Sequence, residues 1–482
     1  MLFNYIIVGA YLFTLALLML YCMHRYSILF LYFKYKRRIV PDPSPAAALP
    51  RVTVQLPVYN EMYVVRRLIA AVAELQYPKE LLEIQVLDDS TDETSALAQA
   101  CVTKLTQDGF TIHYMHRSSR SGFKAGALDE GLAKAHGDLI AIFDADFVPD
   151  KQFLMRTVPF FSQPDMGMVQ TMWGHINRNY SALTQVQAML LDAHFVLEHT
   201  ARNRSGKFFN FNGTAGIWRK QCIIASGGWQ HDTLTEDLDL SYRAQLQGWK
   251  FIFLPHVTTP GEIPIDINSF KSQQHRWAKG GIETALKLFP AILRSRQPLA
   301  VKLESFFHLS CNINYLLILL LSVLTYPALI IRIANGWKEL YVADLIIFLA
   351  GSIPIALYYI ISQKEVKQRW IKNILYLPLL MAAGLGLSIN NGRGVIEALM
   401  GYKSSFLRTP KFCIEGRADT WKHKKYQGYA LDIQIFAETA FGIYFLAAMV
   451  FALKHRVYAA IPFLLLFSSG FLYVALTSLY QK

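Results

Sequence analysis

The sequence predicts an α/β domain with a doubly wound sheet, placed between hydrophobic helices that cross a membrane. Six apolar stretches approach the ~20 residues that span a bilayer, and none of them lies between about residues 40 and 300. Within that polar part, short apolar runs alternate with helix-compatible sequence, which is the pattern of a β-α-β fold. The six apolar stretches are 3–21, 306–332, 341–361, 371–391, 433–453 and 457–479.

Three apolar runs predict the first strands of the sheet, at 52–58, 83–89 and 139–146. Helix-compatible sequence at 61–75 separates the first two runs, and a second such stretch at 124–135 precedes the third. In doubly wound sheets, ligands bind beyond the carboxyl ends of the strands. All three runs end in polar side chains, which predicts a site at that edge: Asn60, Glu61, Asp88, Asp89, Asp144 and Asp146.

The first apolar stretch predicts a retained membrane anchor, because it lacks a preceding basic region and a small-residue cleavage site. Basic residues follow it between Arg25 and Arg38. Under the positive-inside rule, this charge places the polar domain in the cytoplasm and the N-terminus outside. We therefore expect a multi-pass integral membrane protein with a cytoplasmic domain.

The C-terminal third presents a conflict in the membrane topology. Segments 362–373 and 392–432 are both basic, so both are expected in the cytoplasm, yet the apolar stretch 371–391 lies between them. Pro378 and two glycines weaken that stretch as a straight helix. A re-entrant or interfacial element is therefore favoured over a sixth crossing, although five and six spans both remain open.

Composition excludes some classes of protein. The net charge of +13 is concentrated beside the membrane segments, where anionic headgroups attract it, so membrane lipids are the expected partners and nucleic acid is not. The five cysteines form no CxxC pair, so the sequence predicts neither a zinc site nor a disulfide framework. This cysteine usage fits a reducing cytoplasm.

The DAD sequence at 144–146 carries the clearest chemistry. Asp144 and Asp146 at one strand end would repel each other unless a cation or a proton shared the site. Mg²⁺ or Mn²⁺ prefers such oxygen ligands and would also bind a diphosphate. A lone DxD is more often only a polar strand end or a helix cap, and the neighbouring motifs favour the metal.

Four further motifs supply groups for binding a phosphorylated ligand or for proton transfer. Asp88 and Asp89 can accept hydrogen bonds from a base or a ribose, and Lys124 can contact a phosphate, although each could also be a turn or surface residue. Asp237 in TEDLDL lies near the start of a predicted helix. Its carboxylate could cap that helix or act as a general base. In QQHRW, Arg276 suits a diphosphate and Trp277 suits a sugar ring.

His194 and His199 invite a metal interpretation that the spacing argues against. Two residues five apart do not share one face of an α-helix. We therefore interpret both histidines as structural.

Seven motifs occur together in the order and spacing of one family. They are QLPVYNE, VLDDSTDET, KAGAL, FDADF, FNGTAGIWR, TEDLDL and QQHRW. The chain thus resembles the processive family 2 glycosyltransferases, and most of all the cellulose-synthase-like A and C proteins, which make mannan, glucomannan and glucan backbones. The resemblance is close over about 50–300 and general for the flanking membrane segments.

The resemblance implies a GT-A fold and a role for each motif. Asp88 and Asp89 would lie near the nucleotide base, with Lys124, Asp144, Gln273 and Arg276 also binding the nucleotide-sugar. Asp144 and Asp146 would hold the metal, and Asp237 would be the general base. The acceptor would be bound by Asn212, Gly213, Thr214, Glu236 and Trp277.

FLRTPK at 406–411 resembles the gating loop that closes over the donor in cellulose synthases, but departs from its F-x-V-T-x-K form. The corresponding residues are Phe406, Arg408, Thr409 and Lys411. The expected organisation is an anchor at 1–38, a catalytic domain at 39–300, and a membrane region at 301–482 with the gating-like loop at about 392–432.

The expected activity is inverting transfer of sugar onto a growing β-linked polysaccharide, with a β-1,4 linkage expected and the polymer passing through the protein's own channel. The donor could be GDP-mannose, UDP-glucose or GDP-glucose. One alternative is a membrane glycosyltransferase that glycosylates a diacylglycerol or ceramide-like lipid. A second alternative is a transporter or inactive scaffold, which the retention of Asp146, Asp237 and Arg276 and the lack of hydrophobic repeats argue against.

Overall fold

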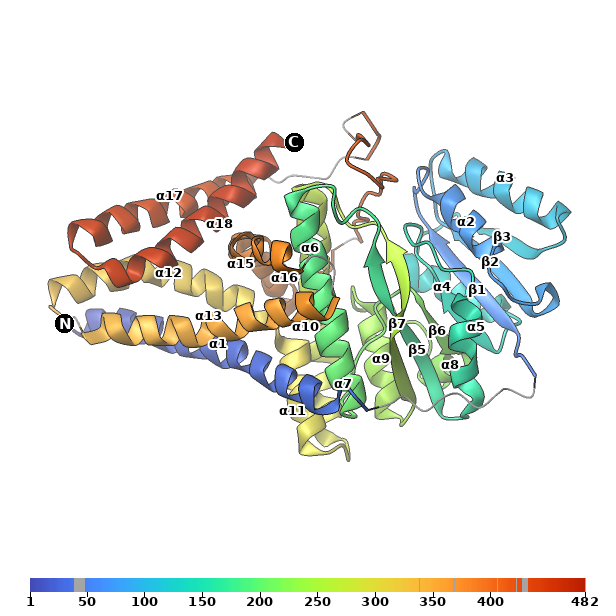
Figure 1. Ribbon diagram of the computed structural model, residues 1–482, viewed down its shortest axis with the longest axis horizontal. Coiled ribbons are helices and arrows are strands. Elements are labelled where there is room, and N and C mark those ends of the chain that lie inside the picture. The colour runs from blue at the N-terminus through green and yellow to red at the C-terminus, as the bar shows by residue number, and fades with distance from the viewer. Residues whose placement is uncertain are drawn as a thin grey trace.

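The computed structural model describes residues 1–38, 48–337, 339–366, 370–404, 406–421, 423–426 and 432–481. Figure 1 shows a domain built from a sheet and its flanking helices at the right of the view. A bundle of long helices lies at the left. The predicted boundary between residues 38 and 39, and parts of segments 362–373 and 392–432, lie outside the described residues. The three-part division of the chain therefore stays a prediction.

A mixed sheet forms the centre of the polar domain, with strand order β3-β2-β1-β4-β6-β5-β7 in the part of the chain that the structure describes. Strands β3, β2, β1 and β4 are parallel, and β6 runs antiparallel to both of its neighbours. The bounds are β1 Val52–Val58, β2 Leu82–Asp88, β3 Thr111–His116, β4 Leu139–Ile142, β5 Met166–His175, β6 Gly216–Arg219 and β7 Lys250–Gly261.

Helices cover both faces of this sheet, which confirms the doubly wound arrangement. Strand side chains alternate between the faces, so Val54 packs in one core while Ile140 packs in the other. One core includes α2 (Val65–Ala73), α3 (Thr94–Gln107) and α5 (Phe153–Thr157). The other includes α4 (Phe123–Lys134), α8 (Lys220–Ala225) and α9 (Glu236–Leu246). Each large apolar side chain so buried contributes about 1.5–3 kcal/mol.

The third predicted strand is shorter than the sequence indicated. It ends at Ile142, because its antiparallel partner β6 supplies only Gly216–Arg219 for pairing. Beyond that point the Asp144 amide donates to the Thr214 hydroxyl at 2.8 Å, and Phe147 turns back onto the Asp144 carbonyl. The DAD sequence therefore lies in a turn beyond the sheet rather than in the strand.

Five helices in the described ranges are long and apolar enough to cross a membrane. Stretch 371–391 is not among them. It is divided between the short helices α14 (Trp370–Ile374), α15 (Leu377–Gly386) and the start of α16 (Ser388–Leu399), which agrees with the expectation that it is not a full crossing. The five are α1 Leu2–Tyr35, α12 Ile313–Ala334, α13 Glu339–Val366, α17 Asp432–Lys454 and Tyr458–Tyr480, which contains α18 Ile461–Tyr480.

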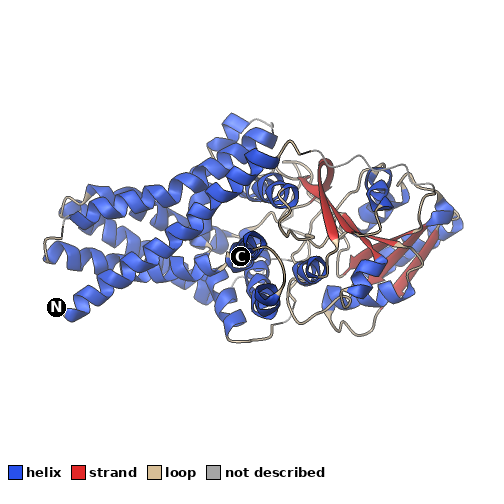
Figure 2. Ribbon diagram, turned by 90° about the horizontal axis from the view of Figure 1, so that it is seen from below, coloured by secondary structure: helices blue, strands red, loops and turns tan. Residues whose placement is uncertain are grey.

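The helix bundle and the sheet domain lie side by side (Figure 2). Lys271 of α10 (Ile267–Arg294) forms a buried 2.6 Å ion pair with Glu438 of α17. Within the bundle, Lys36 contacts Glu365 at 2.8 Å, which joins the ends of α1 and α13. The remaining helices of this region are α6 Ala182–Ala193, α7 Thr200–Arg204 and α11 Leu299–Ser310, with a π-helical turn at His194–His199.

Candidate active site

A pocket opens where the carboxyl ends of β1, β2 and β4 meet. The parallel register places Val58 beside Asp88 and Gln55 beside Ile142, so the residues that follow these strands lie together. Helices α9 and α10 and the segment 406–411 complete its walls. The predicted residues that line it are Asp89, Lys124, Asp144, Asp146, Asn212, Gly213, Glu236, Asp237, Gln273, Arg276, Trp277, Phe406, Arg408, Thr409 and Lys411.

Two predicted residues lie behind the pocket wall instead. The Asp88 carboxylate is fully buried and accepts hydrogen bonds from Ser90, Ser95 and Tyr114. Although burial disfavours its charge, these hydrogen bonds hold the pKa of Asp88 below its usual range. Thr214 is also fully buried, where its hydroxyl supports the Asp144 amide.

Asp89 lines the pocket but is already engaged by a protein cation. Arg117 donates to both of its carboxylate oxygens, at 2.7 and 2.5 Å. This bidentate pair fixes the carboxylate and the loop after β2. If Asp89 contacts a nucleotide base, its carboxylate is thus already held in position by Arg117.

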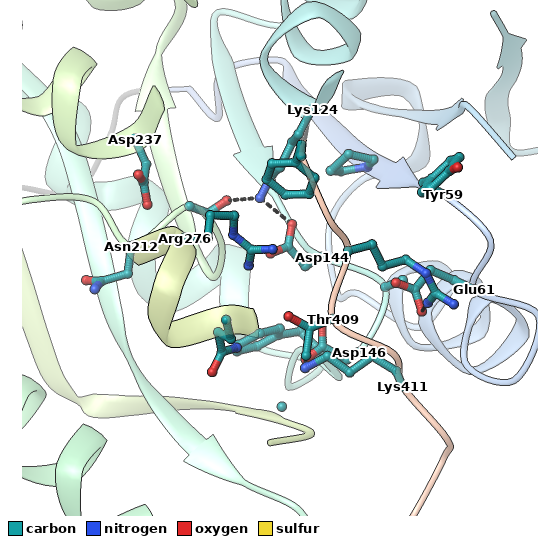
Figure 3. Close-up of a pocket in the computed structure, with 18 of the residues that line it drawn as sticks. Tyr59, Glu61, Lys124, Asp144, Asp146, Asn212, Asp237, Arg276, Thr409 and Lys411 are labelled. Atoms are coloured by element: carbon teal, nitrogen blue, oxygen red, sulfur yellow. Dashed lines mark hydrogen bonds and ion pairs between the residues drawn. The ribbon is translucent and has the colours of Figure 1, made fainter. Parts of the chain in front are cut away.

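The two carboxylates of DAD have separate lysine partners. Lys124 donates to Asp144 at 2.5 Å and to the Gly213 carbonyl at 2.9 Å, as the dashed lines of Figure 3 show. Lys411 donates to Asp146 at 2.6 Å. Burial raises the pKa of Asp144 above its usual value, although Lys124 opposes that effect. Both carboxylates are therefore compensated by protein cations in this conformation.

The oxygen ligands at DAD fit a hard divalent cation for which the protein supplies only some of the ligands. The described residues contain no group of three His, Cys, Asp or Glu side chains arranged for a metal ion. Mg²⁺ and Mn²⁺ are commonly bound by one or two carboxylates, with substrate phosphates and water completing the shell. Asp144 and Asp146 meet that requirement, and a cation would compete with the Lys411 ammonium for Asp146.

Asp237 lies in the first turn of α9, on the same side of the pocket as Asn212 in Figure 3. Its Oδ1 accepts the amide of Leu238 at 2.8 Å. Burial, together with the charge of the neighbouring Glu236, raises the pKa of Asp237 to about 7. A carboxylate with such a pKa can both take up and release a proton near neutral pH.

Gly213 passes directly beneath Asp237 in a left-handed conformation, with φ of +82°. A Cβ at this position would lie 3.1 Å from Asp237 Oδ2 and 3.4 Å from Lys124 Nζ. Only glycine adopts this backbone without strain and leaves room for both side chains. This explains the NGT sequence between Phe211 and Trp218.

Replacing Gly213 with alanine is expected to lower turnover by about tenfold or more, because a methyl group would displace Asp237 and Lys124. Gly206→Ala is the matched control, since Gly206 has a similar φ of +71° and no atom within 4 Å of the added Cβ. Both changes should destabilise the fold by about 1 kcal/mol through backbone strain. Thermal unfolding and initial rates separate the two effects, and equal rates in the two variants would contradict this account.

Helix α10 and the segment 406–411 close the pocket from the other side. Arg276 donates to the Leu407 carbonyl at 2.8 Å and lies 4.4 Å from the Phe406 ring centre. Arg408 pairs with Glu61 at 2.9 Å. The segment that resembles a gating loop is therefore folded into the pocket, in contact with residues from three motifs.

Sequence reasoning assigned no role to several residues that line the pocket. Glu61, which the sequence placed at this edge without a chemical role, is one, and burial raises its pKa to about 8 despite the opposing charge of Arg408. Arg120 is another, with its guanidinium 3.4 Å from the ring centre of Tyr59. Tyr59 and Glu61 belong to the QLPVYNE motif, which could have indicated them, whereas no motif contained Arg120.

The expected separation of His194 and His199, which assumed an α-helix, was wrong. The segment His194–His199 is π-helical, and its wider turn places the two rings 4.4 Å apart on one face. Both rings contact the side chain of Asn212.

The fold and these motifs define a family 2 glycosyltransferase domain of the GT-A type. Residues 50–280 match the family described as "Glycosyltransferase like family 2", so the chain carries a domain of this family. The mannosyltransferase PcManGT from Pyrobaculum calidifontis, solved in complex with GDP-Man and Mn²⁺, superposes with a TM-score of 0.54. The superposition covers 81% of this chain and 100% of PcManGT at 19% identity. It shows that the two proteins share a fold.

Plant enzymes are among the similar curated proteins. Glucomannan 4-beta-mannosyltransferase 7 of Arabidopsis thaliana is 37% identical over 316 residues, which cover 63% of this chain and 57% of that protein. Glucomannan 4-beta-mannosyltransferase 1 of Cyamopsis tetragonoloba is 36% identical over 353 residues, which cover 70% of this chain and 66% of that protein. The chain spans about half the length of the curated relatives it matches.

Proposed function

We propose that this protein is a membrane-embedded, inverting glycosyltransferase that extends a β-1,4-linked mannan or glucomannan from a nucleotide-sugar. The observation that carries the proposal is the placement of Asp237 in one pocket with the DAD carboxylates, Lys124 and Arg276. A base, a site for a cation and positive groups for a diphosphate are what sugar transfer from such a donor requires. The names of the relatives point to mannose as the sugar.

In the proposed reaction, Asp237 takes the proton from a hydroxyl group of the acceptor. The oxygen then attacks the anomeric carbon from the face opposite the nucleotide, which converts an α-linked donor into a β-linked product. Lys124 and Arg276 stabilise the charge that develops on the departing diphosphate. A divalent cation at Asp144 and Asp146 would neutralise further charge there when bound. Trp277 offers a ring face for the acceptor sugar.

Segment 406–411 is proposed to gate the pocket. Phe406 and Lys411 line the cavity and contact Arg276 and Asp146, which the donor and the cation also need. Entry of a nucleotide-sugar therefore requires these side chains to exchange partners. Residues 39–300 are proposed as the catalytic unit, and the basic residues at the end of the first apolar helix favour a cytoplasmic location for it.

The rate of transfer is expected to rise with pH through about 7. Because burial raises the pKa of Asp237, the side chain holds a proton below that pH and cannot accept another. Initial rates at low donor concentration, measured between about pH 5 and pH 8, should show this single ionisation. Donor binding over the same range should stay nearly constant, and a flat rate profile would contradict the assignment.

The function is tested with purified protein in detergent or vesicles, supplied with Mg²⁺ or Mn²⁺ and a panel of GDP- and UDP-sugars. PcManGT, which shares this fold, was solved with GDP-Man and Mn²⁺, so this pair is the first to try. A long product that β-mannanase degrades would support the proposal. A short, organic-extractable product would favour glycolipid synthesis, and no transfer from any donor would overturn both.

A further inference from the structure

Both ends of the Asn212 side-chain amide are held by histidines from one π-helical turn. His199 Nε2 lies 2.5 Å from Asn212 Oδ1, and Asn212 Nδ2 lies 3.0 Å from His194 Nε2. The turn His194–His199 connects α6 to α7, and residues five apart meet there only because it is π-helical. Such turns occur frequently at functional sites in proteins.

A buried carboxylate anchors this arrangement from behind. Glu198 is paired with Arg25 of α1 and with Arg202 Nη1 at 3.1 Å, and it accepts the Tyr358 hydroxyl at 3.0 Å. Although burial opposes ionisation, Arg202 and Arg25 hold the pKa of Glu198 well below its usual range. Glu198 is therefore an acceptor only, and two helices of the membrane bundle hold it in place.

The ionised state of Glu198 determines the direction of each hydrogen bond in the series that runs from Glu198 through His194 and Asn212 to His199. His194 Nδ1 lies 2.9 Å from Glu198 Oε2, so this nitrogen carries the proton and donates. In a neutral ring His194 Nε2 then accepts, which requires the Asn212 amide nitrogen to face it. The amide oxygen consequently faces His199, whose Nε2 must donate.

The surroundings of His199 are consistent with that single donation. Its ring is fully buried among Phe195, Phe209 and Phe253, with ring centres 5.1 to 5.3 Å away. His199 Nδ1 is buried and has no hydrogen-bond partner among the described residues. The fold thus directs His199 Nε2 at Asn212 and leaves His199 Nδ1 without a hydrogen bond. Burying a polar nitrogen in this way costs free energy, which an apolar side chain at this position would avoid.

We propose that His194 and His199 are positioning residues that hold the Asn212 amide in one orientation for a hydroxyl group of the acceptor sugar. The histidines use one N–H and one oxygen lone pair of the amide, so one of each remains for a ligand. Asn212 lines the pocket, and the adjoining Gly213 lies beneath the Asp237 carboxylate. The inference rests on the proposed function and extends it to the residues that recognise the acceptor.

The test compares two replacements of one side chain. In His199→Phe the ring shape is kept and the donor is lost, whereas in His199→Gln the side-chain amide can still donate to Asn212. We expect His199→Phe to raise the KM for added mannohexaose by about tenfold or more, the effect of one lost buried hydrogen bond. The KM for the nucleotide-sugar and its slow hydrolysis should change by less than about threefold. His199→Gln should recover most of the acceptor affinity.

Asn212→Ala supplies the second comparison. If the histidines act through Asn212, adding His199→Phe to Asn212→Ala should cause little further loss of acceptor affinity. Equal acceptor KM values in the wild type, His199→Phe and His199→Gln would overturn the inference, as would a parallel loss of donor hydrolysis. Should the wild type transfer no sugar, the proposed function fails. Calorimetric binding of mannohexaose to the wild type and to His199→Phe then decides the inference separately, with equal or absent binding counting against it.

Discussion

Asp237→Asn is expected to lower the turnover number by about 100- to 10,000-fold, the range that general bases contribute. The amide keeps the shape of the side chain and can still accept the Leu238 N–H, so the start of α9 should remain intact. What it cannot do is take a proton from the acceptor hydroxyl. Donor affinity should change little, because the groups proposed to bind the diphosphate are untouched.

Steady-state rates and donor binding by calorimetry test this expectation together. Asp232→Asn is the matched control, since Asp232 is exposed five residues earlier in the chain and pairs with Lys287. That control should retain wild-type rates. Substantial turnover in Asp237→Asn would exclude Asp237 as the base and leave Glu236 as the carboxylate to test next.

Asp146→Asn is expected to abolish the response of the enzyme to divalent cations and to lower turnover by about 1000-fold, since a catalytic metal contributes several kcal/mol. In contrast to Asp237→Asn, it should also weaken donor binding, because diphosphate and cation bind together. The change removes the negative charge that now compensates Lys411. Lys411 would then remain near the Glu262 carbonyl, 2.5 Å away, and would itself repel a cation.

Chelation of the wild type followed by readdition of Mg²⁺ or Mn²⁺ gives the reference curve for this prediction. The control is Asp150→Asn, an exposed aspartate shortly after the same turn, whose activity and metal response should match the wild type. An Asp146→Asn enzyme with unchanged metal dependence would place the cation elsewhere.

The ends of the first two predicted strands could be predicted from local pattern. Strand β1 has the predicted bounds, and β2 differs from its predicted bounds by one residue, because buried parallel strands appear as continuous apolar runs. Since such strands align, the polar residues after Val58, Asp88 and Ile142 had to meet at one edge. The five membrane-spanning candidates were likewise evident from apolar length.

Three features of the site depended on geometry that sequence spacing does not report. The Asp88 carboxylate points away from the pocket because Ser90, Ser95 and Tyr114 donate hydrogen bonds to it. The pairing of His194 with His199 depends on a π-helical turn, which α-helical periodicity cannot reveal. Arg120 reaches the pocket through its contact with Tyr59, and no motif contained it.

The sequence alone determined the fold class, the division between polar and apolar parts, and the set of carboxylates, lysines and arginines available for chemistry. These follow from hydrophobic pattern and motif order, which act over short distances along the chain. Which of these groups pair with one another depends on the tertiary fold. Lys411 meets Asp146 and Arg408 meets Glu61 across hundreds of residues, because α10 and the membrane helices return the segment 406–411 to the edge of the sheet. Such contacts depend on packing of the whole chain, and no local pattern encodes them.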